Sequence, residues 1–464
     1  LFFCSADPGL KAGLLFVMLK IAGGICCILF VAFLSALPII IDKLFIPTPP
    51  RSPEVLLRSE TEWGNEPEMS DIQPYKIAYD LKHLTDLRRR LLSWRPWSDT
   101  VPMAHSKNSS YGVNPKYMQS LISYWRDTYN WRSYEQKINS LGLKSTTIDG
   151  LRLVFHEVNG GKQKAILLLH GWPGSIHEFS KVLLKINAST QEYSIVCPSL
   201  PGFGFSSAPT EEGYSSVEMA LTLLRLMAKL KYRTFVVQGG DWGSVVARAM
   251  AYIDPVSVIG LHLNFFPVLP PPGTYVFDMF KVWAFDDENS KSRAKKLLDV
   301  NGLFQITGYF HQQATMPETL GFALSDSPAG LAAWILEKFQ GWSDPDRPIE
   351  DKFRRDDLLT NIMLYWLTNT ITSSMRMYKE VVSLEAISVL YLPVTVPVGI
   401  SLFPHEVLSP PDTVIKKHFT NIVQFTKHKQ GGHFAALEEP KAFTDDLLAF
   451  LAKLPKSVPG TDTN

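Results

Sequence analysis

A chain of 464 residues is long enough for one large α/β domain with insertions, or for more than one ordinary domain. The formal net charge of +1 gives no support for nucleic acid as a partner. Apolar residues make up 45% of the chain, which is ample for a core. The four cysteines form no CxxC or Cys/His pattern, so we expect neither a disulfide framework nor a metal site.

The first element is an uncharged apolar run, Ile21–Ile41, whose length matches a membrane-spanning helix. A cleaved signal peptide is the alternative, because Ser35-Ala36-Leu37 resembles a cleavage site; however, the run is longer than the usual apolar core of a signal peptide. We therefore predict an uncleaved membrane anchor and linker over residues 1–49. Basic residues on the two sides of the run slightly favour a cytoplasmic catalytic body.

Residues 50–148 are predicted to be a helical lead-in region packed on the main domain. Leucines recur at helical spacing over Ala78–Trp94, with basic residues between them. A second helical stretch, Pro115–Lys137, carries a stripe of Trp and Tyr side chains. Aromatic stripes of this kind are more often core than a cofactor site, so the stripe is expected to pack against the domain.

Strands that alternate with helices predict the first part of an α/β core over residues 149–265. Such alternation indicates a parallel sheet with helices on both faces. The predicted strands of this part are Leu151–Glu157, Ala165–His170, Tyr193–Cys197, Thr234–Gln238 and Val258–Asn264.

Residues 266–390 interrupt this alternation and are predicted to be a helical lid, because they are helical in pattern, aromatic and punctuated by proline. The core is expected to resume over residues 391–464. Its predicted elements are the strands Val396–Leu402 and Asn421–Thr426 and a helix from Glu439 to Leu454.

Chemistry centres on Gly239-Gly240-Asp241-Trp242-Gly243, which follows a predicted strand and opens a predicted helix. A sharp strand-to-helix turn leaves no room for side chains two positions either side of its apex, and it pushes the apex side chain outward. The apex here is Asp241, whose carboxylate is a nucleophile at pH 7 without a base. Attack at a carbon gives an ester, so alkyl-carbon chemistry is favoured over ester cleavage. A helix N-cap is the alternative role for Asp241.

Two further groups follow in chain order. Glu406 ends one predicted strand, and His433 lies in a Gly-Gly-His-Phe loop after the last strand. The order nucleophile, acid, histidine is that of the α/β-hydrolases. We therefore predict His433 as a general base oriented by Glu406, with Glu385 and Asp412 as weaker candidates for the acid.

The turn His170-Gly171-Trp172-Pro173 follows the strand expected beside that of Asp241. The backbone N–H groups of Trp172 and Trp242 are predicted to form an oxyanion hole. His170, Gly171 and Pro173 are expected to border the substrate pocket.

Several motifs together resemble the microsomal epoxide hydrolases, which include the juvenile hormone epoxide hydrolases of insects. The resemblance covers about residues 50–455 and includes the N-terminal anchor. The motifs are HGWPGS, PSLPGFGFS, QGGDWGS, LLTNIMLYW, SSMRMYKE and GGHFAALEEP. HGxP and DWG alone are shared with haloalkane dehalogenases, but the combined set is far more specific.

The resemblance implies an α/β-hydrolase fold with Asp241 as nucleophile, His433 as base and Glu406 as acid. It also implies that two lid tyrosines, Tyr309 and Tyr378, donate to the epoxide oxygen. Phenols are still protonated at pH 7 and can do this. The expected reaction gives a vicinal diol and needs no metal or cofactor, and the expected location is the endoplasmic reticulum membrane.

The expected substrate is a lipophilic epoxide, because the predicted lid is rich in aromatic side chains. Two alternatives stay open: a haloalkane dehalogenase with the same nucleophile, and a catalytically silent lipid-binding protein on this fold. The lid aromatics on which this expectation rests are Phe265, Phe266, Phe280, Trp283, Phe304 and Trp334.

Overall fold

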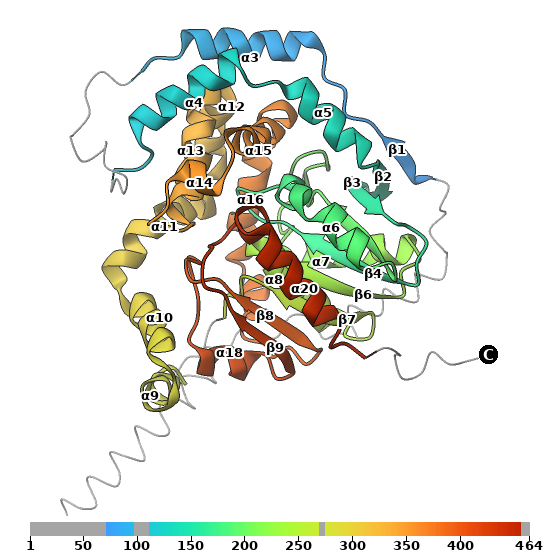
Figure 1. Cartoon of the computed structure of the whole chain (residues 1–464), viewed down its shortest axis with the longest axis vertical. Helices are drawn as coiled ribbons and strands as arrows, with labels where there is room; N and C mark the ends of the chain where they lie inside the picture. The colour runs from blue at the N-terminus through green and yellow to red at the C-terminus, as the bar shows by residue number, and fades with distance from the viewer. Residues whose placement is uncertain (1–70, 97–110, 269–273, 456–464) are drawn as a thin grey trace, which may run out of the picture.

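The computed structural model describes residues 71–96, 111–268 and 274–455 (Figure 1). They form a nine-stranded sheet in the order β1-β2-β3-β5-β4-β6-β7-β8-β9. The pairs β1–β2, β2–β3 and β3–β5 are antiparallel, and the rest of the sheet is parallel. The strands are β1 (Gln73–Tyr75), β2 (Leu143–Ile148), β3 (Leu151–Val158), β4 (Lys164–Leu169), β5 (Tyr193–Pro198), β6 (Thr234–Gly239), β7 (Val258–Leu263), β8 (Val398–Leu402) and β9 (Ile422–Lys427).

Central strands β4, β5 and β6 are buried almost throughout, as expected for parallel strands covered on both faces. Helices α6 (Leu183–Ser189) and α20 (Pro440–Leu451) pack together on one face of the sheet. Helices α7 (Ser216–Lys229) and α8 (Asp241–Ile253) pack together on the other (Figure 1). This arrangement is the predicted α/β core.

The lead-in region contains α3 (Leu81–Ser93), α4 (Pro115–Asp127) and α5 (Trp131–Ser140). The single helical stretch predicted for residues 115–137 is therefore wrong, since it divides in two. Helix α4 begins where the Asn114 side chain accepts hydrogen bonds from the backbone N–H groups of Lys116 and Tyr117.

A purely helical lead-in is also wrong, because this region supplies β1 and β2 to the sheet. Strands β2 and β3 form a hairpin across Asp149-Gly150, both of which have positive φ. Asp-Gly between two strand-like runs is a strong hairpin signal. The domain boundary predicted after residue 148 falls inside this hairpin.

The described part of the predicted lid is helical, and α3 of the lead-in region packs against α13 of the lid. After the lid the chain returns through β8, α18 (Asp412–His418), β9, α19 (Ala435–Glu438) and α20. The lid helices are α9 (Tyr275–Phe285), α10 (Glu288–Leu298), α11 (Val300–Thr315), α12 (Pro317–Asp326), α13 (Pro328–Gly341), α14 (Ile349–Lys352), α15 (Arg355–Thr368), α16 (Ile371–Val381) and α17 (Leu384–Ser388).

Across residues 71–96, 111–268 and 274–455, no helix has both the length and the apolar character needed to cross a bilayer. The predicted anchor at Ile21–Ile41 lies outside these described residues.

Candidate active site

Asp241 stands at the sharp turn between β6 and α8, with φ of 47°. This left-handed backbone is unusual for a residue other than glycine and is found where a nucleophile is held above a sheet. The flanking glycines are required by space. A Cβ on Gly239 would lie 2.5 Å from the carbonyl oxygen of Gly243, and a Cβ on Gly243 would lie 2.3 Å from that of Leu169. The small residues therefore allow the turn that presents Asp241.

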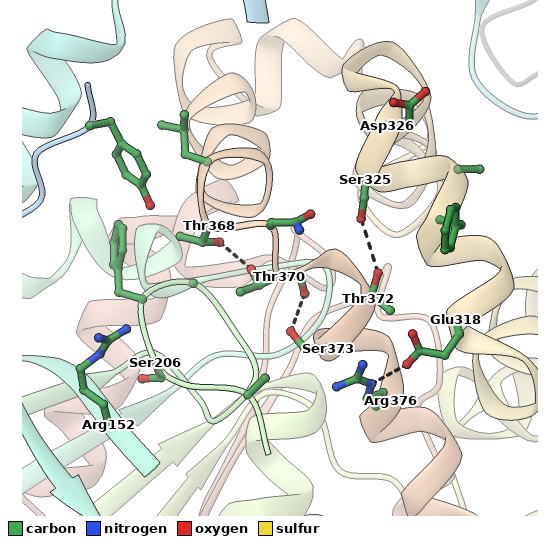
Figure 2. A pocket seen from close by; sticks show the side chains of 18 of the residues that line it. Arg152, Ser206, Glu318, Ser325, Asp326, Thr368, Thr370, Thr372, Ser373 and Arg376 are labelled. Carbon is green, nitrogen blue, oxygen red and sulfur yellow. Dashed lines mark hydrogen bonds and ion pairs between the residues drawn. The ribbon is translucent and has the colours of Figure 1, made fainter. Parts of the chain in front are cut away.

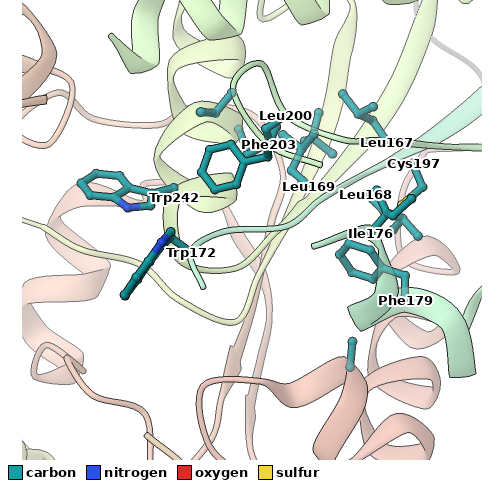
Figure 3. Packing of buried hydrophobic residues seen from close by; sticks show 14 of the residues in the cluster. Leu167, Leu168, Leu169, Trp172, Ile176, Phe179, Cys197, Leu200, Phe203 and Trp242 are labelled. Atoms are coloured by element: carbon teal, nitrogen blue, oxygen red, sulfur yellow. The ribbon is translucent and has the colours of Figure 1, made fainter. Parts of the chain in front are cut away.

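The turn after β4 holds one oxygen of this carboxylate. The backbone N–H of Trp172 donates to Asp241 Oδ1 at 2.7 Å. A Cβ on Gly171 would lie 2.2 Å from the same oxygen, so only glycine permits the approach. The N–H of Trp242 belongs to the first turn of α8, where N–H groups lack partners within the helix. Figure 3 shows both tryptophans at the end of the buried core formed by Leu167–Leu169 and Phe203.

The other carboxylate oxygen faces the predicted histidine. His433 Nε2 lies 3.3 Å from Asp241 Oδ2, and His433 Nδ1 lies 2.6 Å from Glu406 Oε1. Glu406 Oε1 also accepts from the backbone N–H of Val407 at 2.7 Å, which fixes the carboxylate. The structure therefore brings Asp241, His433 and Glu406 together in one continuous row.

Neither alternative acid is seen in this row. Asp412 is paired with Arg293 and Lys427 instead. The side chain of Glu385 lies outside the described residues.

His433 is buried between two carboxyl groups. Burial opposes its protonation, but the charges of Glu406 and Asp241 and their hydrogen bonds outweigh burial and raise the pKa of His433 well above its usual value. A protonated imidazole in the resting site follows from this balance.

Tyr309 of α11 and Tyr378 of α16 both reach the site. The ring of Tyr309 stacks on Trp172 with centroids 5.6 Å apart, and Tyr378 meets Trp242 edge-on at 4.8 Å. Tyr378 Oη is buried and makes no hydrogen bond within the described residues. Burial and, to a lesser extent, the charge of Asp241 raise the pKa of both phenols. Both phenols therefore keep their protons at neutral pH and can donate a hydrogen bond.

Trp172 contacts the Asp241 carboxylate, whereas His170 and Pro173 form hydrogen bonds that fix the turn. His170 Nε2 accepts from the backbone N–H of Leu200 at 3.1 Å, and burial lowers the pKa of His170 to about 4. The carbonyl of Pro173 accepts from Asn361 Nδ2 at 2.7 Å. Tyr365 donates to the carbonyl of Gly174 at 2.6 Å. Asn361 and Tyr365 both belong to the LLTNIMLYW motif, but no local pattern in the motif indicates their partners.

Glu178 is the residue at the site that sequence reasoning missed. It borders an enclosed void that also touches Asp241, His433, Gln238 and Asn264. The space that the centre of a water molecule can occupy in this void is about 10 Å³, so the void has room for roughly one water molecule. Desolvation raises the pKa of Glu178 to about 8, with the nearby charge of Asp241 adding to the shift. Its position five residues after Pro173 carries no pattern that marks a buried carboxyl group.

A larger cleft of about 1230 Å³ lies elsewhere, between α12, α16 and the loop that follows β5 (Figure 2). Its lining is polar and includes Arg152 and the ion pair of Arg376 with Glu318. None of the predicted catalytic side chains borders it, so its size alone does not connect it to the reaction. Within the described ranges, no cluster of three His, Cys, Asp or Glu side chains could hold a metal ion.

The lid aromatics from which a lipophilic substrate was predicted lie in different surroundings. Phe265 does pack against the ring of His433, with centroids 5.5 Å apart, but Trp334 donates instead to Gln313. Phe280, Trp283 and Phe304 are exposed at the surface of the lid. They are therefore not substrate-pocket residues in this structure, and Phe266 is buried in the main core.

Comparison with known proteins identifies relatives along most of the chain. Residues 72–179 match the family described as "Epoxide hydrolase N terminus", and residues 164–303 match the family "alpha/beta hydrolase fold". The chain is 36% identical over 431 residues to Epoxide hydrolase 1 of Sus scrofa, which covers 86% of this chain and 94% of that protein.

It is 33% identical over 458 residues to the Juvenile hormone epoxide hydrolase of Bombyx mori, which covers 92% of this chain and 98% of that protein. The crystal structure of juvenile hormone epoxide hydrolase from the silkworm Bombyx mori superposes with a TM-score of 0.77 at 32% identity, over 83% of this chain and 96% of that one.

Proposed function

The chain belongs to the epoxide hydrolase family with the α/β-hydrolase fold, and we propose that it opens lipophilic epoxides to vicinal diols through an ester on Asp241. The observation that carries this mechanism is the placement of the two Asp241 oxygens. One oxygen accepts from Trp172 N–H at 2.7 Å, and the other lies 3.3 Å from His433 Nε2. Trp172 thus orients the Asp241 carboxylate, and His433 lies within reach of its other oxygen.

In the first step, an oxygen of Asp241 forms a bond to an epoxide carbon and the ring C–O bond breaks. The ring oxygen takes a proton from a lid phenol, Tyr378 or Tyr309. Such a donor matters because ring opening otherwise leaves an alkoxide. The product of this step is a hydroxyalkyl ester and a phenolate.

Ester formation removes the negative charge of Asp241. Because that charge helps to raise the pKa of His433, its loss lowers this pKa and allows the imidazole to give up its proton. The released proton balances the one that the phenol supplied. His433 becomes a neutral base, still oriented by Glu406.

In the second step, His433 takes a proton from water, and the resulting hydroxide attacks the carbonyl carbon of Asp241. The N–H groups of Trp172 and Trp242 stabilise the oxyanion. Collapse breaks the bond to the alkyl oxygen, which takes the remaining proton and leaves as the diol. Asp241 returns as a carboxylate beside a protonated His433, so the resting site is restored.

Substituting His433 by Gln tests this sequence, because only the second step needs the base. After incubation with an epoxide, intact mass should increase by one substrate, and the adduct should map to residues 239–243. Asp241→Asn should gain no mass at first. In wild type, a single turnover in heavy-oxygen water should label the Asp241 carboxylate and leave the diol unlabelled. Label in the diol alone would instead mean direct attack of water on the epoxide.

The dehalogenase alternative has weaker support, because that reaction has no use for two lid phenols. The silent-protein alternative is opposed by the continuous row of Asp241, His433 and Glu406. Diol formation tested with xenobiotic oxides, fatty-acid epoxides and juvenile hormone would define the substrate class.

We further propose that Ile21–Ile41 anchors the enzyme in the endoplasmic reticulum membrane as a single span, with the catalytic body in the cytoplasm. The support is the uncharged length of this run. The protein should stay with membranes in high salt and carbonate, and release by carbonate alone would contradict an integral anchor. Deletion of residues 1–45 should leave activity largely intact, since the proposed catalytic residues lie beyond residue 165.

A further inference from the structure

Helices α9, α10 and α11 of the lid expose a set of apolar side chains, called the patch, that the proposed reaction does not use. We define the patch by eight exposed side chains in residues 277–306. Sixteen large apolar side chains are exposed in the described residues, and these eight account for half of them within 30 positions. Such a concentration marks an interaction surface more often than scattered exposure does. The patch consists of Phe277, Phe280, Trp283, Phe285, Leu298, Val300, Phe304 and Ile306, which are 41–82% exposed.

The patch is not a part of the lid core that lacks packing partners. On α9, Asp278 and Val282 are buried, and Val282 packs with Ala294 of α10 and Val414 of α18. Phe277, Phe280 and Lys281 follow at helical spacing on the opposite face. The buried face of helix α9 therefore already packs against other helices, and its exposed face carries separate apolar side chains. Figure 1 shows α9 and α10 projecting from the body of the protein.

The acidic side chains of these helices mostly have basic partners. Asp278 pairs with Lys417 at 2.8 Å, the half-exposed Asp287 pairs with Lys427 at 2.7 Å, and the exposed Glu288 pairs with Lys291 at 3.0 Å. By contrast, the exposed basic side chains Lys281, Lys295 and Lys296 form no ion pair with any described residue. Lys295 Nζ lies over the ring of Trp283 at 5.5 Å. Unpaired lysines thus stand among the exposed aromatic side chains.

A cleft of about 170 Å³ connects this region with the loop of the proposed catalytic acid. The core side of the cleft is formed by Pro404, Glu406 and the residues that follow Glu406. The lid side carries both charged and apolar side chains, which are Arg293, Lys296, Asp299, Leu297, Leu303 and Ile306. Ile306 belongs to both the patch and the cleft. A lipophilic molecule dissolved in an apolar phase that contacts the patch would therefore lie next to the cleft.

We infer that residues 277–306 dock on the surface of an anionic phospholipid bilayer, with the aromatic side chains in the acyl-chain boundary and the lysines at the headgroups. Aromatic rings with basic residues beside them suit that boundary.

This contact is separate from the proposed anchor, and a photo-crosslinking experiment distinguishes them. The full chain is reconstituted in vesicles of phosphatidylcholine and phosphatidylserine that contain a phospholipid with a diazirine in its acyl chain. After irradiation, lipid adducts are mapped by peptide mass spectrometry. We expect adducts within residues 277–306 and none at Val256 or Phe322, which are exposed apolar side chains outside the patch. Adducts within residues 21–41 without any in 277–306 would overturn the inference and leave the anchor intact.

A double substitution, Phe280→Ser with Phe304→Ser, should reduce adducts in 277–306 several-fold. Phe322→Ser is the matched control, because Phe322 is as exposed as Phe304 but lies on α12. The double variant should keep wild-type kcat and KM for a water-soluble epoxide, and its KM for a lipophilic epoxide dissolved in vesicles should rise several-fold. Unchanged adducts in the double variant would overturn the inference.

Two other occupants have their own signatures. If the patch bound a second copy, chemical cross-links between chains would map to residues 277–306 in the absence of vesicles. If another segment of the chain covered the patch, hydroxyl-radical labelling of Phe280 and Phe304 would be weak before vesicles are added. Either result would overturn docking on the bilayer, and strong labelling that falls when vesicles are added would support it.

Discussion

The turn around Asp241 is closely packed and requires glycine, whereas the lid segment 277–306 exposes large apolar side chains. At the turn, Gly239 and Gly243 stand where a Cβ would meet backbone atoms at 2.5 Å or less. In the lid segment, aromatic side chains point into open space and touch few neighbours. Gly308, on the same helix as Phe304, has nothing within 4 Å of an added Cβ.

This difference fits the two proposed roles. In the proposed mechanism the Asp241 carboxylate must be held within about half an ångström of its productive position, and its close-packed surroundings, which leave no space for added atoms, suit that role. Contact with a fluid lipid phase needs area and chemical type, not fixed positions.

Gly243→Ala should have the largest effect, because its Cβ would lie 2.3 Å from the carbonyl oxygen of Leu169. The strand β4 or the turn must shift, which displaces the Asp241 carboxylate from His433. We expect activity to fall by at least ~100-fold and the free energy of unfolding to fall by roughly 1–3 kcal/mol. Turnover and urea unfolding measure the two effects. Wild-type activity in this variant would show that the turn is not close-packed.

Tyr378→Phe removes one of the two proposed donors to the ring oxygen and leaves the packing of the ring in place. Single-turnover formation of the ester should slow by ~10–100-fold, while breakdown of the ester keeps its rate. Tyr309→Phe is the companion variant. If ester formation kept its rate in both variants, the assignment of the two phenols would have to be abandoned.

Glu178→Gln should change how stability depends on pH. The pKa of Glu178 is raised to about 8 in the folded protein, so the folded state keeps its proton while the unfolded state loses it near pH 4.5. The stability that this proton provides is present below pH 4.5 and is lost as pH rises toward 8, by at most about 1.4 kcal/mol per pH unit. Gln stays neutral, so the variant should gain on wild type across that window. Parallel unfolding midpoints at pH 5 and pH 8 would contradict this.

Gly308→Ala should have the smallest effect, and its sign should be opposite to that of Gly243→Ala. The helical position has open space around it, so Ala should stabilise α11 by up to about 1 kcal/mol. Activity on a water-soluble epoxide should be unchanged. A destabilised variant would mean that α11 around Gly308 is as tightly constrained as the turn around Asp241.

Local patterns in the sequence determined much of the catalytic arrangement. The small residues around Asp241 predicted the turn, because sterics within a few positions dictate it. The chain order of Asp241, Glu406 and His433 predicted that their side chains would meet, since parallel strands end at the same edge of a sheet. The distances of 3.3 Å and 2.6 Å from His433 to Asp241 and Glu406 agree with that expectation. Most core strands were predicted for a similar reason, as apolar runs between turns.

Features that depend on contacts between distant segments of the chain could be seen only in the tertiary structure. The void beside Glu178 forms from segments far apart in the chain, so no spacing marks it. Strand β1 pairs with β2 about 70 residues later, and its three residues carry too little pattern to predict a strand. The aromatic residues of the lid predicted a lipophilic substrate, but hydrophobicity alone does not say which face of a helix is covered. Phe265 faces His433 and Phe304 faces outward because the packing of the lid on the core, and not residue type, sets their exposure.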